Sequence, residues 1–252
     1  MRFAFRLRPL QALALLSLGL LAGPTARAGL VHDYEFKGNL NDSLGGPSLV
    51  SLGGTVGSSS YTFGAQQGLS LSNGLASPGT YTIDLSFAFD TLSGFRKFLD
   101  FKGLGADAGL YVLSSNLNFF PVVTGSGTPF SPGTFARVDL TRDDVAGLVS
   151  GYVNGVQQFQ FNDSSTAYAT FTSASNIINF FQDDTATSGR ESSSGSVNQI
   201  RIFNTALSAT DVAALNNLAS VPEPAAALMV ASGLALSGLG LRLRTRSTRP
   251  VA

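Results

Sequence analysis

The sequence contains no cysteine and no tryptophan, and it has a single histidine, His32, among its 252 residues. Without cysteine there can be no disulfide bond and no thiolate metal site, so packing of the core must stabilise the fold. A serine-hydrolase triad would have to use His32, and no Gly-x-Ser-x-Gly turn occurs in a strand-to-helix setting. The sequence also lacks a histidine pair for zinc and a glycine-rich phosphate loop ending in Lys-Ser or Lys-Thr.

Charged residues are scarce, at 13% of the chain, and the formal net charge is zero. This balance hides an acidic centre. Residues 29–220 carry eight Lys and Arg against fifteen Asp and Glu, a net charge of about −7. Because an acidic surface repels phosphates, this composition argues against nucleic acid as a partner.

The first 28 residues have the pattern of a secretory signal peptide. Three arginines precede an apolar run over residues 10–22, and Ala26-Arg27-Ala28 supplies a small-x-small cleavage site. The position and the basic start disfavour the alternative, a buried core helix. We expect residues 1–28 to direct Sec-type export and to be removed, so that the mature protein begins near Gly29.

The other end of the chain has an apolar span followed by arginines. Residues 225–241 carry no charge and would form a helix of about 26 Å at about 1.5 Å per residue. That length is marginally enough for a transmembrane helix. Arg242, Arg244 and Arg246 follow, and the positive-inside rule keeps them cytoplasmic, so the rest of the protein would face outward.

Pro222-Glu223-Pro224, the apolar span and the arginine-rich end together resemble the PEP-CTERM sorting signal of Gram-negative bacteria, over residues 221–252. The resemblance implies transient anchoring in the inner membrane and cleavage near Pro222-Glu223-Pro224 by an exosortase-type protease. It also implies delivery to the cell surface or an exopolysaccharide matrix. The prolines keep this segment extended and accessible to a protease. A permanently membrane-anchored surface structural protein is the alternative.

Alternating residues predict a half-buried β-strand over residues 80–90. Polar and small residues occupy one face of this strand. The other face is wholly apolar and consists of Tyr81, Ile83, Leu85, Phe87 and Phe89. We expect that face to lie in the core.

Several further strands and one helix are predicted. Residues 109–122 form a hairpin around Ser114-Ser115-Asn116, and residues 137–161 form two, the second joined by Asn154-Gly155, the strongest two-residue turn signal. Strands are also expected over 176–181 and 196–203. Ser208 to Asp211 resembles a capping box and starts a helix with Val212, Leu215 and Leu218 on one side. This order predicts an all-β protein, an antiparallel β-sandwich over residues 29–220 with one short C-terminal helix.

Three segments resemble laminin-G-like, concanavalin A-like jelly rolls. Residues 32–46 are similar to the opening strand and loop, residues 140–156 to the central hairpin, and residues 195–215 to the closing strand and helix. The resemblance implies a jelly-roll sandwich that binds a carbohydrate or a protein. Asn198-Gln199 stands where many relatives have an acidic residue, so no role is carried over to that position.

Concanavalin A-like folds include glycoside hydrolases, which need two carboxylates about 5–5.5 Å apart when they retain configuration. The Glu-x-Asp-x-x-Glu run of the related glucanases is absent. Asp33 and Glu35 share a strand face with Lys37, which is typical of a solvated face. Tyrosines could replace tryptophan as a sugar-stacking surface. No catalytic constellation is present, and a glycan hydrolase remains an alternative.

One acidic cluster suggests a metal. Asp183 and Asp184 end a predicted strand, a loop rich in Ser, Thr and Gly follows, and Glu191 closes it. Hard oxygen ligands on a flexible loop suit calcium, so these three residues are the candidate calcium site. The alternatives are a solvated turn, or neutralisation of one carboxylate by Arg190.

Taken together, these observations predict an exported surface or matrix protein whose sandwich is a non-catalytic module that binds a polysaccharide or a surface protein. The alternatives are a glycan hydrolase and a permanently anchored structural protein.

Overall fold

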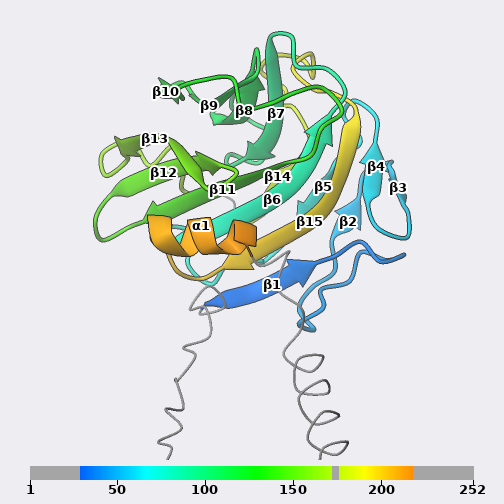
Figure 1. The fold of residues 1–252 in the computed structure, drawn as a ribbon, viewed down its shortest axis with the longest axis horizontal. Coiled ribbons are helices and arrows are strands. Elements are labelled where there is room, and N and C mark those ends of the chain that lie inside the picture. The colour runs from blue at the N-terminus through cyan, green and yellow to red at the C-terminus, as the bar shows by residue number, and fades with distance from the viewer. Residues whose placement is uncertain (1–28, 172–175, 218–252) are drawn as a thin grey trace, which may run out of the picture.

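The structure, a computed structural model, describes residues 29–171 and 176–217. Within these residues the chain forms fifteen strands and one helix. The strands make two antiparallel sheets, one of eight strands and one of seven. The two sheets pack face to face as a β-sandwich, and Figure 1 shows β11, β6 and β15 in one layer and β7 to β9 in the other.

The eight-stranded sheet has the order β13 (Val156–Asn162), β12 (Leu148–Val153), β11 (Ala136–Asp143), β6 (Tyr81–Phe89), β15 (Gly195–Phe203), β4 (Tyr61–Phe63) and β3 (Thr55–Val56), with β1 (Leu30–Tyr34) also paired to β15. The seven-stranded sheet has the order β10 (Val123–Thr124), β9 (Asn116–Phe120), β8 (Gly109–Leu113), β7 (Phe95–Asp100), β14 (Ile178–Phe180), β5 (Leu69–Leu71) and β2 (Val50–Ser51). The helix is α1 (Ala209–Asn217).

The core lies between the sheets and is built largely of phenylalanine. The apolar face predicted for β6 is confirmed, because all five of its side chains belong to the main hydrophobic cluster. The ring of Phe87 lies 4.8 Å from that of Phe98 in β7 and 5.3 Å from that of Phe181, measured between centroids. Such aromatic contacts add to the free energy gained by burial and join the two sheets.

The opposite face of β6 is also buried, so the expected half-buried strand is wrong on that side. Thr82 is 0% exposed and Asp84 is 1% exposed. The Thr82 hydroxyl donates to the carbonyl of Thr205 at 2.8 Å and accepts from the amide of Leu207 at 2.9 Å. The chain that follows β15 therefore runs back over this face, which alternation within one strand could not reveal.

The predicted hairpins are confirmed. Asn154 and Gly155 join β12 to β13 with φ angles of 50° and 78°, the left-handed pair that a tight two-residue hairpin turn requires. Ser114 and Ser115 join β8 to β9 with φ angles of 47° and 74°. Both turns place the flanking strands in register for the sheet.

Six strands were not predicted from the sequence: β2, β3, β4, β5, β7 and β10. Five of these have only two or three residues, too few for a periodic pattern. The sixth, β7, is interrupted by a register shift between Lys97 and Leu99. A β-bulge breaks the strict alternation by which a strand is recognised.

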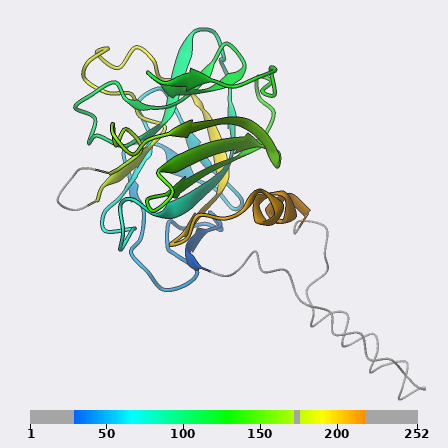
Figure 2. The same ribbon diagram turned by 90° about the vertical axis from the view of Figure 1, so that its left-hand side faces the viewer.

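The helix α1 packs against the outer face of the eight-stranded sheet, as Figures 1 and 2 show. Ser208 caps the helix as predicted, because its hydroxyl accepts a hydrogen bond from the Asp211 amide at 3.2 Å, and the same hydroxyl donates to the Asp211 carboxylate at 2.6 Å. Val212 and Leu215 are buried in a small second cluster with Phe203.

None of the helices within residues 29–171 and 176–217 is long and apolar enough to cross a membrane. The predicted terminal signals lie outside the described residues: the signal peptide over 1–28, Pro222-Glu223-Pro224, the apolar span 225–241, and Arg242, Arg244 and Arg246.

Candidate functional site

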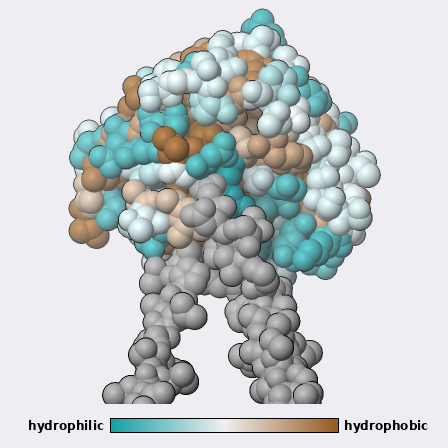
Figure 3. All heavy atoms as spheres, viewed as in Figure 1, coloured by the Kyte–Doolittle hydropathy of each residue, from teal (hydrophilic) through white to brown (hydrophobic). Residues whose placement is uncertain are grey.

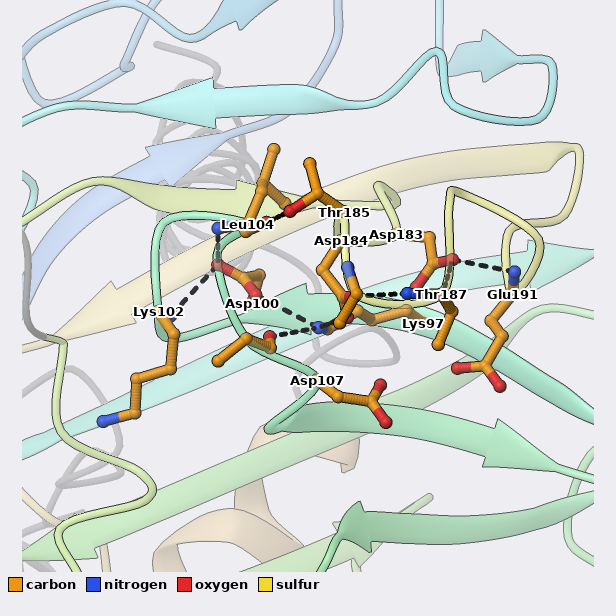
Figure 4. A network of polar contacts seen from close by, with 12 residues as sticks. Lys97, Asp100, Lys102, Leu104, Asp107, Asp183, Asp184, Thr185, Thr187 and Glu191 are labelled. Atoms are coloured by element: carbon orange, nitrogen blue, oxygen red, sulfur yellow. Dashed lines mark hydrogen bonds and ion pairs between the residues drawn. The ribbon is translucent and has the colours of Figure 1, made fainter.

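The loop that carries Asp183, Asp184 and Glu191 connects β14 to β15 and folds over the outer face of the seven-stranded sheet. Its anchor is Lys97 of β7, whose amide donates to the Glu191 carbonyl at 2.8 Å. Figure 4 shows the Lys97 side chain reaching between Asp100 and Asp184. We call Lys97, Asp100, Asp107, Asp183, Asp184 and Glu191 the Lys97 cluster.

The bulge in β7 explains how this cluster forms. In a regular strand, residues three apart point to opposite faces, so Lys97 and Asp100 could not meet. With one extra residue inserted between Lys97 and Leu99, both side chains lie on the outer face. The Lys97 Nζ atom is then 3.1 Å from Asp100 Oδ2 and 2.5 Å from Asp184 Oδ2, and all three side chains are 0% exposed.

Asp184 is held on both of its oxygens. Its Oδ1 accepts hydrogen bonds from the amides of Ala186 at 2.8 Å and Thr187 at 3.2 Å, while its Oδ2 faces Lys97. Burial raises the pKa of this carboxyl, but the hydrogen bonds from Lys97 and the two amides outweigh it and hold the pKa below its usual value. Asp184 is therefore ionised and forms an ion pair with Lys97.

Asp183 is bound differently. Its Oδ2 accepts from the Thr187 hydroxyl at 2.6 Å and from the Glu191 amide at 2.8 Å. Its Oδ1 is buried and has no hydrogen-bond partner among the described residues. Arg190 does not neutralise this carboxylate, because its Nε donates to the Thr187 carbonyl at 3.0 Å instead.

Glu191 is half-buried at the edge of the cluster. Burial, followed by repulsion from Asp107, Asp183 and Asp184, raises the pKa of its carboxyl to about 7. Glu191 therefore titrates near neutral pH, which makes it the most pH-sensitive group of the cluster.

The three carboxylates predicted as calcium ligands lie in this loop, and Lys97 contacts one of them, Asp184. Within the described part of the chain, no three His, Cys, Asp or Glu side chains are arranged to hold a metal ion. Asp184 is occupied by Lys97, whose ammonium takes the place that a cation would take. Calcium binding through Asp183, Asp184 and Glu191 stays a prediction.

A groove lies on the outer face of the other sheet, between β12, β13 and the start of α1, with a volume of about 330 Å³. We call it the β12–β13 groove. Its lining is mostly polar, with one aromatic ring: Thr141, Asp143, Ala146, Leu148, Ser150, Tyr152, Gln157, Gln160, Ala206, Leu207, Ser208 and Ala209. Figure 3 shows the side of the molecule on which α1 lies, where hydrophilic residues surround scattered hydrophobic ones.

Outward-pointing residues of adjacent strands build this groove. Ser150 pairs with Gln160 across β12 and β13, and the Gln160 amide donates to the Ser150 hydroxyl at 3.0 Å. Gln157, opposite Tyr152, is exposed, and Tyr152 itself is buried against the helix. Sequence analysis missed this site, although the alternation of polar and apolar residues in β12 and β13 gave a usable signal.

A second buried polar network adjoins the groove on the same face. Asp84 of β6 and Asp139 of β11 are paired across the sheet. Arg137 lies 3.1 Å from Asp84, and Arg201 also contacts Asp84. Asp139 has no hydrogen-bond partner among the described residues for either carboxylate oxygen, and burial, with repulsion from Asp84, raises its pKa well above the usual value. Burial therefore favours the neutral form of Asp139, whereas Asp84 forms ion pairs with two arginines.

The side chain of His32 helps to hold the loop that follows β1. Its Nδ1 lies 2.7 Å from Asp42 Oδ2, and Asp42 also accepts hydrogen bonds from the amides of Asp33, Leu44 and Gly46. These contacts hold the loop after β1 in place.

No family model and no curated protein matches the chain. It is similar in fold to domain 4 of AbnA, a GH43 extracellular arabinanase from Geobacillus stearothermophilus, in complex with arabinotriose: 17% identity, TM-score 0.53, 74% of this chain and 98% of that chain. It is also similar to a Trypanosoma rangeli sialidase in complex with sialic acid: 16% identity, TM-score 0.56, 75% of this chain and 33% of that chain. A mutant of that sialidase displaying trans-sialidase activity is 17% identical, with a TM-score of 0.60, over 77% of this chain and 33% of that chain.

At these identities the likeness shows the fold alone. The neighbours are β-sandwich, jelly-roll-like domains, in agreement with the predicted sandwich. The chain spans the whole arabinanase domain but about a third of the sialidase chains, so the fold matches one domain of those larger proteins.

Proposed function

We propose that this protein is an exported surface or matrix protein whose laminin-G-like sandwich binds carbohydrate without cleaving it, in the β12–β13 groove. The observation that carries the proposal is the lining of that groove. The groove presents the exposed side-chain amides of Gln157 and Gln160, beside the buried side chains of Thr141, Ser150 and Tyr152. Amides that both donate and accept hydrogen bonds in a surface groove suit the hydroxyl groups of a sugar.

The comparisons support the same class of ligand. The arabinanase domain was solved with arabinotriose and the sialidase with sialic acid, so sandwiches of this kind occur in proteins that bind or process glycans. The acidic body favours a neutral or basic ligand over a polyanion.

A glycan array probed with the purified protein tests this proposal. We expect binding to a neutral polysaccharide or oligosaccharide, and at least a tenfold loss on substituting Gln157→Ala and Gln160→Ala together. Both side chains are exposed, so the double variant should fold normally. Asn116→Ala, on β9 of the opposite sheet, is the matched control and should bind like wild type. Equal binding by the double variant and wild type would place the ligand elsewhere.

A glycan hydrolase is the second candidate, and the Asp84–Asp139 pair is the observation that favours it. A carboxyl with a raised pKa beside a second carboxyl held by ion pairs is the electrostatic pattern of a retaining glycosidase. Both residues are at most 1% exposed, however, so a sugar ring could not reach them in this conformation. Incubation with a panel of polysaccharides should release no reducing ends. Release that disappears in Asp139→Asn would favour the hydrolase.

Export and sorting form the other part of the proposal. The signal peptide over 1–28 and the PEP-CTERM-like end over 221–252 support export by a Sec-type machinery, transient anchoring in the inner membrane and processing by an exosortase-type protease. Permanent anchoring in the membrane is the competing outcome.

A further inference from the structure

Lys97 is a buried primary amine with two carboxylates against it. Its Nζ lies 2.5 Å from Asp184 Oδ2 and 3.1 Å from Asp100 Oδ2, and the three side chains are fully buried. An ion pair out of contact with water costs desolvation energy on both groups. The carbohydrate site proposed above does not use this cluster.

From this geometry we propose that Lys97 and Asp184 join covalently, as an amide between Nζ and the Asp184 side-chain carbon, with Asp100 as the proton carrier. The bond would link β7 to the loop before β15, two segments 87 positions apart in the chain. In a protein without cysteine, it would supply the kind of cross-link that a disulfide supplies elsewhere.

Each atom around Asp184 has a part in such a reaction. The Asp184 Oδ1 atom accepts hydrogen bonds from the amides of Ala186 and Thr187. Two such donors stabilise the negative charge that develops on this oxygen during attack. The Oδ2 atom, which would leave, lies 3.4 Å from the hydroxyl of Tyr111. Because the pair is held in contact and shielded from water, attack is effectively intramolecular.

Asp100 is fixed in the orientation that the proton transfer needs. Its Oδ1 accepts from the amides of Lys102 at 3.1 Å and Leu104 at 2.8 Å, which leaves Oδ2 pointing at Lys97. Asp184 Oδ2 is nearer to Nζ than Asp100 Oδ2, and Asp184 rather than Asp100 is therefore the acceptor.

The step is balanced without any other reactant. The Lys97 ammonium gives one proton to Asp184 Oδ2 across their 2.5 Å contact, so that a free amine meets a neutral carboxyl group, and Nζ forms the N–C bond with the Asp184 carboxyl carbon. As this bond forms, Asp100 Oδ2 takes a second proton from the nitrogen. The bond from that carbon to Oδ2 then breaks, and Oδ2 leaves as water with two of the three ammonium protons, one of them returned by Asp100. The third proton stays on the amide nitrogen. A buried pair of charges is thereby replaced by a neutral amide, which removes their desolvation cost.

Peptide mapping of the denatured full chain tests the proposal. Trypsin cannot cleave after an acylated lysine, so the linked protein should yield one branched peptide, residues 97–102 joined to residues 143–190. Its mass should be the sum of the two peptides less one water. An unlinked chain yields residues 98–102 and residues 143–190 separately. Recovery of those two free peptides from the bulk of the folded wild-type protein would overturn the proposal, and so would loss of water confined to either peptide.

Two variants test the role of Asp100. Asp100→Asn keeps the shape of the side chain but cannot take the proton, so we expect the unlinked peptides and a lower melting temperature. Lys102→Arg changes a neighbouring lysine whose Nζ donates to the carbonyls of Ala167 and Thr170, and this variant should stay linked. A fully linked Asp100→Asn protein would overturn the assignment of Asp100 as proton carrier.

Discussion

At the scale of single residues, the chemistry of this protein depends on charges that the fold brings together from distant positions. Lys97 and Asp184 are far apart in the chain, as are Asp84 and Arg201. A lone lysine inside FRKFLD or a lone aspartate in TYTIDLSFAFD gives no sign of its partner. The sequence therefore identified the acidic residues of the loop but predicted them to be metal ligands. It could not show that the Lys97 ammonium, on another strand, contacts Asp184.

Glu191 allows a test of this charge arrangement through pH. The folded state raises the pKa of its carboxyl from 4.5 to about 7, so the folded protein holds that proton more tightly than the unfolded chain. The stability from the neutral carboxyl is fully present below pH 4.5 and is lost as the pH rises through about 7. Glu191→Gln is neutral at every pH and should keep that stability.

We therefore expect the melting temperature of wild type to fall more than that of Glu191→Gln between about pH 5 and about pH 8. Scanning calorimetry at matched ionic strength measures this difference. Glu35→Gln serves as the control, because Glu35 forms only an exposed ion pair with Lys37 and should leave the wild-type profile unchanged. Parallel profiles for Glu191→Gln and wild type would show that Glu191 is not coupled to folding.

At the scale of elements, the sequence predicted the turns, strand faces and helix cap that depend on residues adjacent in the chain. The turn at Asn154-Gly155, the apolar face of β6 and the helix cap at Ser208 each follow from a few adjacent residues, and each is confirmed. The bulged strand β7 and the two-residue strands exist because other strands pair with them. The β12–β13 groove likewise requires α1 to fold back over the sheet, and no single strand encodes that contact.

The helix α1 carries a stability prediction. Ser208→Ala removes the side-chain oxygen that accepts the Asp211 amide, and loss of an N-cap typically costs about 1 kcal/mol. We expect urea unfolding to show a loss of about that size, with a matching weakening of glycan binding because Ser208 lines the groove. Ser208→Asp keeps a capping oxygen and should retain most of the stability. An equal loss in both variants would mean that the cap does not stabilise the helix.

At the scale of the whole molecule, the two ends of the sandwich lie together. The Asn204 amide donates to the carbonyl of Gly29 at 2.8 Å, and Leu30 packs against the cluster formed by α1. β1 and α1 occupy the same end of the molecule in Figure 1. Cleavage after residue 28 and near residue 223 would therefore leave the core and the groove intact.

The processing of the C-terminal end is the last prediction. We expect protein extracted from the surface of a host with the sorting enzyme to lack everything after the Pro222-Glu223-Pro224 region, because the prolines keep that region extended and open to a protease. Tryptic digestion measures this directly, since an unprocessed chain yields a peptide over residues 202–242 that contains Met229. Mature protein should instead give a peptide that starts at residue 202 and stops near the Pro-Glu-Pro motif. The double variant Pro222→Ala/Pro224→Ala should retain the peptide over residues 202–242. If the bulk of mature wild-type protein also contained this peptide, the C-terminal helix would be a permanent anchor.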